Sequence, residues 1–135
     1  MPNRRKMWIY VPPKPKVPEK LKIETTQKAA ELVEKVLKPM HVKPPPRNMQ
    51  FNYVVDIYTK WYRHYFYFCS KYRSPSPDAF SPFFEHKFAR MEYLGRTKRF
   101  NLSFMRHTGE WIEIYPDLSL DKCLAAIKDD PYFQP

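Results

Sequence analysis

The fold is decided by residues 51–70, which read FNYVVDIYTKWYRHYFYFCS. Residues 50–58 show the two-residue alternation of a β-strand, with Phe51, Tyr53, Val55 and Ile57 on one side. Residues 63–70 are apolar on both sides, so they predict a second strand that is central in a sheet and covered on both faces. The residues between the two segments predict a hairpin turn, and this hairpin begins the sheet.

Three more strands are predicted after the hairpin, at residues 84–94, 99–106 and 111–115. The turn from Gly95 to Lys98 joins the first two of them, and the turn from His107 to Glu110 joins the last two. Short connections of this kind join antiparallel neighbours. The sequence therefore predicts a five-stranded antiparallel meander.

Two amphipathic helices are predicted, one on each side of the strands in the chain. Residues 25–38 carry apolar side chains at helical spacing, with Thr25 or Thr26 as the N-cap and Pro39 as the residue that ends the helix. Residues 119–129 show the same spacing, with Ser119 as the N-cap and Pro131 after the end. Because two such helices can cover one face of a sheet, the predicted fold class is α+β.

An extended, proline-rich arm is predicted in front of these elements. The 135 residues suit one domain, which we assign to residues 23–135, and the arm is residues 1–22. Its prolines favour the polyproline II conformation. The formal net charge of the chain is +10, and residues 1–22 contain seven Lys or Arg residues against one Glu. The arm therefore holds most of the excess positive charge.

Basic arms are typical of proteins that bind polyanions, because neutralising phosphates releases counterions. The arm residues that we predict to contact nucleic acid are Arg4, Arg5, Lys6, Trp8, Lys14 and Lys16. Two alternatives stay open. The arm can pack on its own domain, or its prolines, which are spaced as in PxxP ligands, can dock on a protein partner.

The domain contributes a second group of candidate residues. Trp61, Tyr62 and Arg63 combine stacking rings with a cation in the predicted hairpin turn, as single-stranded nucleic-acid binders do. The favoured interpretation of the turn between the last two strands is an ordinary hairpin in which Arg106 pairs with Glu110. The functional alternative is a phosphate clamp formed by Arg106 and His107.

One enzymatic alternative rests on Asp56, Glu85 and Lys87. This set resembles the catalytic pattern of PD-(D/E)XK nucleases, which implies two carboxylates that hold Mg²⁺ and a lysine that orients water. Asp56 lacks the proline that precedes it in that pattern, and alternating charge on an exposed strand is the simpler interpretation of Glu85 and Lys87. The chain has no P-loop, dinucleotide-binding fingerprint or nucleophile-elbow motif, so we expect a binding protein rather than an enzyme.

The remaining reactive residues predict no further chemistry. Cys69 and Cys123 lie in apolar patterns and are predicted to be buried free thiols. The four histidines are not spaced as metal ligands, so we predict no metal and no cofactor. No stretch has the length of a membrane span and no signal peptide is recognisable, so we expect a cytoplasmic protein without a membrane partner.

Three segments from Pro44 onward carry a resemblance to a known family. They are the strand Lys87-Phe88-Ala89-Arg90-Met91-Glu92-Tyr93, the sequence Met105-Arg106-His107 followed by Trp111, and the ending Lys128-Asp129-Asp130-Pro131-Tyr132-Phe133. In these segments the chain resembles a family of small uncharacterised bacterial proteins, a domain of unknown function. The resemblance implies a small α+β domain and implies no activity.

The leading hypothesis is a small basic binding protein that engages nucleic acid, with RNA as one form, through the arm and the aromatic hairpin. The second hypothesis is an adaptor whose proline-rich arm docks on an acidic protein partner. The third is the metal-dependent nuclease of Asp56, Glu85 and Lys87. The sequence makes no prediction of the oligomeric state.

Overall fold

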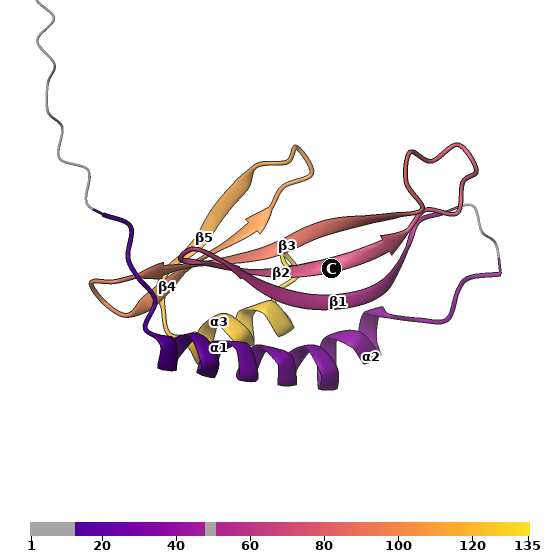
Figure 1. Ribbon diagram of the computed structural model, residues 1–135. Coiled ribbons are helices and arrows are strands. Elements are labelled where there is room, and N and C mark those ends of the chain that lie inside the picture. The colour runs from indigo at the N-terminus through magenta and orange to yellow at the C-terminus, as the bar shows by residue number, and fades with distance from the viewer. Residues whose placement is uncertain (1–12, 48–50) are drawn as a thin grey trace, which may run out of the picture.

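A five-stranded antiparallel sheet forms the centre of the molecule (Figure 1). The structure is a computed structural model that describes residues 13–47 and 51–135. The strands are β1 (Tyr53–Tyr62), β2 (Tyr65–Arg73), β3 (Phe83–Leu94), β4 (Arg99–Met105) and β5 (Trp111–Leu118). Their order in the sheet is their order in the chain, and every neighbouring pair is antiparallel. The predicted meander is therefore confirmed.

The first hairpin turn lies later in the chain than predicted. The alternation of β1 continues beyond residue 58 to Tyr62, and the turn consists of Arg63 and His64. Arg63 adopts a positive φ of 56°, which a two-residue hairpin turn requires. The buried His64 fixes the turn to β3, because its carbonyl accepts a hydrogen bond from the backbone N–H of Tyr93.

The first helix is longer at both ends than predicted. It begins with α1 (Glu19–Leu32), continues through a π-helical turn η1 (Val33–Leu37), and ends with α2 (Lys38–His41). Thr25 is buried in its middle and caps nothing. Pro39 does not end the helix, because the N–H of Lys38 bonds to the carbonyl of Val33, five residues earlier. The wider turn accommodates the proline ring.

The last helix, α3 (Leu120–Asp129), agrees with the prediction at both ends. The Ser119 hydroxyl accepts a hydrogen bond from the backbone N–H of Lys122 and caps the helix. Figure 1 shows α1 and α3 on the same side of the sheet. They are linked there by an ion pair of 3.0 Å between Lys28 and Asp121. The fold is thus the predicted α+β fold with a meander and two helices.

The core lies between the sheet and these helices. Its largest fully buried side chains are Tyr93, Phe66, Phe68, Phe88, Phe100, Leu37, Ile57, Met91, Leu102 and Ile127. The opposite face of the sheet, which we call the open face, has no helix on it (Figure 1). The prediction that β2 is covered on both faces was therefore wrong, since Tyr65 and Tyr67 at its open-face positions are only half-buried.

The described part of the arm packs on the domain. Val17 is buried in the core, and Pro15 lies against Gly95 in the turn between β3 and β4. Because α1 begins at Glu19, residues 19–22 belong to the helix and not to the arm. Arg4, Arg5, Lys6 and Trp8 lie outside the described residues. Across residues 13–47 and 51–135, no helix has the length and apolar character needed to span a bilayer.

Candidate nucleic-acid interface

The open face carries alternate residues of the strands, which the pairing register brings into rows. Tyr62 of β1 is opposite Tyr65 of β2, and Lys60 is opposite Tyr67. Tyr67 is in turn opposite Arg90 of β3. Trp111, at the start of β5, completes this group, with its ring 5.9 Å from that of Tyr67. Aromatic rings and cations therefore alternate across several strands.

Arg90 lies at the centre of the open face. Its guanidinium is 4.8 Å from the ring centre of Tyr65 and 4.9 Å from that of Trp111, so two aromatic rings hold it. Its Nε is buried without a hydrogen-bond partner, and no carboxylate among the described residues forms an ion pair with it. A positioned guanidinium without an anionic partner is suited to an anion.

Lys60, which lies in the same row as Arg90, forms a hydrogen-bonded group with Glu85 and Tyr58. The Lys60 ammonium and the Tyr58 hydroxyl donate to the Glu85 carboxylate over 2.6 Å and 2.7 Å. Burial raises the pKa of Glu85, but these two hydrogen bonds outweigh it and the net pKa is lowered. Lys87 is 3.8 Å from the same carboxylate, and its ammonium lies 5.4 Å from the ring centre of Tyr67.

The tip of the β1–β2 hairpin extends the open face. Tyr62 is 57% exposed, and the Arg63 guanidinium lies 5.2 Å from the centre of its ring. These two predicted residues are thus together, exposed and next to Tyr65. Behind the tip, the His64 ring is 3.3 Å from the Glu92 carboxylate.

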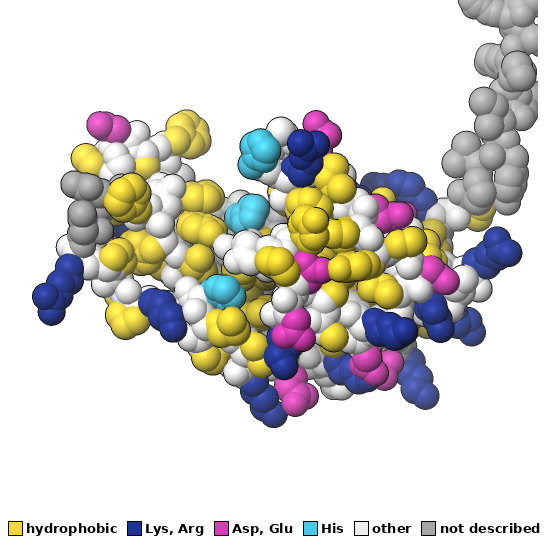
Figure 2. All heavy atoms as spheres, turned by 180° about the vertical axis from the view of Figure 1, so that it is seen from behind, with side chains coloured by type: hydrophobic (Ala, Val, Ile, Leu, Met, Phe, Trp, Pro, Cys, Tyr) yellow, Lys and Arg dark blue, Asp and Glu magenta, His cyan; other side chains and the backbone are white. Residues whose placement is uncertain are grey.

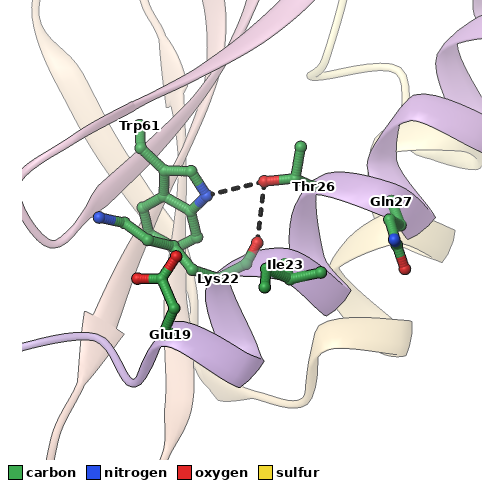
Figure 3. Close-up of a pocket in the computed structure, with 6 residues that line it drawn as sticks. All are labelled: Glu19, Lys22, Ile23, Thr26, Gln27 and Trp61. Atoms are coloured by element: carbon green, nitrogen blue, oxygen red, sulfur yellow. Dashed lines mark hydrogen bonds between the residues drawn. The ribbon is translucent and has the colours of Figure 1, made fainter.

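Trp61, the third residue predicted for the hairpin surface, lies on the opposite side of the sheet. Its indole N–H donates to the Thr26 hydroxyl over 3.1 Å, and that hydroxyl donates to the Lys22 carbonyl (Figure 3). Its ring is 4.8 Å from that of Phe66. Trp61 therefore fastens α1 to the hairpin and is separate from Tyr62 and Arg63.

Arg106 and His107 are exposed in the turn between β4 and β5. The backbone N–H of Arg106 bonds to the Glu110 carbonyl, but the two side chains do not form an ion pair in the described structure. Both Arg106 and His107 line a surface hollow together with His86 and Tyr132. Burial lowers the pKa of His86, so this ring is neutral at pH 7.

The residues of the nuclease alternative are only partly together. Asp56 and Glu85 line one surface hollow, but each is paired with a lysine. Asp56 is 3.2 Å from the Lys38 ammonium. In the part of the chain that the structure describes, no group of three His, Cys, Asp or Glu residues is placed to hold a metal ion.

Both cysteines are buried and free, as predicted. Burial raises the pKa of the Cys69 thiol to about 12, and it has the same effect on Cys123. Neither thiol is therefore a nucleophile at neutral pH.

Comparison with known proteins adds one result to this geometry. Residues 5–135 match the family DUF3024, a domain of unknown function. The chain belongs to this family. The match confirms the predicted resemblance to an uncharacterised domain family, and it extends over nearly the whole chain. No curated protein and no solved structure matches the chain.

For this DUF3024 chain, sequence reasoning missed Tyr65, Tyr67, Arg90 and Trp111 as surface residues. The alternation of β2 contained the signal, because residues 65, 67 and 69 share one face once the register is fixed. For Trp111 the sequence contains no such signal. Its approach to Arg90 depends on the twist of the sheet, which turns the β4–β5 hairpin away from the helices (Figure 1).

Proposed function

We propose that the protein binds single-stranded nucleic acid through its basic arm, the hairpin tip and the open face of the sheet. The observation that carries this proposal is Arg90, which two aromatic rings hold on the open face without an anionic partner. A phosphate group of the nucleic-acid backbone supplies that anion. RNA is the first type of nucleic acid to test. The nucleic acid would be met in the cytoplasm.

The surface offers both kinds of contact that single strands use. Lys60 and Lys87 keep 41% and 40% of their side chains exposed, so both can approach a phosphate backbone. Tyr62 presents an exposed ring on which a base can stack, which is sequence-tolerant because every base has a π-face. The proposed preference is therefore for single strands over duplexes and is weak in sequence.

The variant Tyr62→Ala tests the stacking part. We expect its affinity for a fluorescent single-stranded oligonucleotide to fall about tenfold, since one base–aromatic stack contributes roughly 1–3 kcal/mol. Trp61→Phe is the matched control, because that ring lies on the helix side, and its affinity is expected to stay at the wild-type value. Fluorescence anisotropy measures both. Equal losses in the two variants, or none in Tyr62→Ala, would refute this surface.

Removal of residues 1–12 tests the arm. These residues include Arg4, Arg5 and Lys6, and the cut leaves the packed Val17 in place. We expect weaker binding and a smaller dependence of log affinity on log salt, by about 2 for three phosphate contacts on a single strand. An unchanged salt dependence would exclude the arm from the interface. Binding of an acidic protein instead of any oligonucleotide would favour the adaptor hypothesis.

A further inference from the structure

Four exposed phenylalanines gather at one end of the sheet, where β1 and β3 begin and β2 ends. Phe51 is 72% exposed, Phe80 108%, Phe83 40% and Phe84 42%. Phe83 is opposite Arg73 in the register, which is opposite Tyr53 of β1. We call this region the phenylalanine end, and Figure 1 shows it where the long β2–β3 loop projects.

The β2–β3 loop is built to hold Phe80 outward. Its base is closed by a hydrogen bond of 2.8 Å from the N–H of Ser74 to the carbonyl of Pro82, and the Ser74 hydroxyl also donates to Asn52. Prolines at residues 75, 77 and 82 restrict the backbone between these points. An apolar side chain exposed on a restrained loop indicates a contact with another molecule.

The charges at the phenylalanine end have both signs. The Lys71 ammonium and the Arg73 guanidinium lie 4.5 Å and 5.1 Å from the ring centre of Phe83. Asp78 lies in the projecting loop, two residues before Phe80. Among residues 13–47 and 51–135, none of these three groups forms an ion pair. The surface thus offers unpaired cations and an unpaired anion around exposed rings.

We propose that the phenylalanine end binds a second copy of this chain in a twofold-symmetric dimer. In such an interface each surface patch meets its own copy, so Asp78 of one chain faces Arg73 of the other, and this pair occurs twice. Phe84 points to the other face of the sheet, where it stacks on Tyr72 at 5.0 Å. Phe51, Phe80 and Phe83 supply on the order of 400 Å² of surface per chain, about half of the roughly 800 Å² that a standard interface buries on each side.

The mixed charge favours a second copy over a lipid surface. An anionic bilayer attracts Lys71 and Arg73 but repels Asp78, which lies in the same loop as the most exposed ring. A second copy places the Asp78 carboxylate of each chain against the Arg73 guanidinium of the other. Hydrophobic and basic side chains lie together at this end of the space-filling view, on the left of Figure 2. This proposal is independent of the nucleic-acid interface on the open face.

Sedimentation velocity over a concentration series tests whether the dimer forms and where. The wild-type protein is expected to shift from the 16.4 kDa monomer to a dimer as its concentration rises toward about 1 mM. Phe80→Ser is expected to weaken the dimer at least tenfold, and it cannot disturb the core because the ring is fully exposed. A wild-type protein that stays monomeric throughout, or a dimer that Phe80→Ser leaves unchanged, overturns the proposal.

Charge reversal tests the pairing itself. Asp78→Lys and Arg73→Glu are each expected to abolish the dimer, because each puts two pairs of like charges into the interface. An equimolar mixture of the two variants, and the double variant D78K/R73E, restore opposite charges at both pairs and are expected to dimerise again. Lys98→Glu, in the turn at the other end of β3, is the control and is expected to behave as wild type.

Each remaining outcome decides against the proposal. A mixture that stays monomeric removes the Asp78–Arg73 pairing. If Lys98→Glu also breaks the dimer, the charge reversals act through the net charge of the protein and not through a specific Asp78–Arg73 pair. Monomeric protein that sediments with vesicles of phosphatidylcholine and phosphatidylserine, but not with phosphatidylcholine alone, identifies an anionic bilayer as the occupant instead.

Discussion

Gly95 shows at the scale of one residue how the arm is held. A Cβ added there would lie 3.0 Å from the Cβ of Pro15, well inside the ordinary carbon–carbon contact distance. We expect Gly95→Ala to lower the free energy of unfolding by about 1 kcal/mol, because Pro15 or the turn must shift. Urea denaturation measures this. The double variant with Pro15→Gly should recover part of the loss, and unchanged stability of Gly95→Ala would contradict the contact.

The same scale explains why one predicted site residue is misplaced. Trp61 and Tyr62 were both assigned to a turn, and there both side chains would be available. In the structure β1 continues through them, and consecutive strand residues point to opposite faces. Tyr62 therefore joins the open face and Trp61 packs against α1. The sequence does not show this, because Thr59 and Lys60 are both polar and Trp61 and Tyr62 are both aromatic, which breaks the alternation.

At the scale of elements, the π-helical turn η1 is the least regular part of the first helix. Proline lacks the N–H of an α-helical hydrogen bond and its ring crowds the preceding turn. We expect Pro39→Ala to raise the free energy of unfolding by about 1 kcal/mol, since alanine lets the α-helix continue. Thermal unfolding measures the gain. Pro131→Ala, after the end of α3, is the control, and we expect it to leave the free energy of unfolding unchanged. An equal gain in both variants would show that Pro39 does not distort the helix.

The strands were predictable because alternation and turn residues occur together between 50 and 115. The start of the first helix was missed, although an acidic residue in the first turn, here Glu19, is typical of a helix N-terminus. Thr25 and Thr26 are both predicted as caps because Ser and Thr are common at helix N-termini. Thr25 is instead buried in the core, which depends on packing against the sheet. Local signals thus fixed element type better than element ends.

At the scale of the whole molecule, Glu85 links the outer strand β1 to β3 across β2. Its folded-state pKa is lowered from 4.5, so its contribution to stability is fully present above that value and is lost as the pH falls through the lowered pKa. We expect Glu85→Gln to be less stable than wild type by about 1 kcal/mol at pH 7, with the difference shrinking below pH 4.5. Chemical denaturation across pH checks this. A difference independent of pH would contradict the ionic account.

The meander was predictable for the whole molecule because short turns leave few other topologies. The open face was not predictable, since the approach of Trp111 to Arg90 depends on the twist that accumulates from β3 through β4 to β5. The arm's charge could be counted from the sequence, while the packing of Pro15 and Val17 on the domain could not.

The strands occur in the sheet in the same order as in the chain, and this order affects how the protein folds. Each hairpin pairs segments that are close in sequence, so the sheet can grow one strand at a time as the polypeptide leaves the ribosome. The ion pair between Lys28 and Asp121 joins segments that are far apart in the chain. Helix α1 must therefore wait, with its apolar side only partly covered, until α3 has been synthesised.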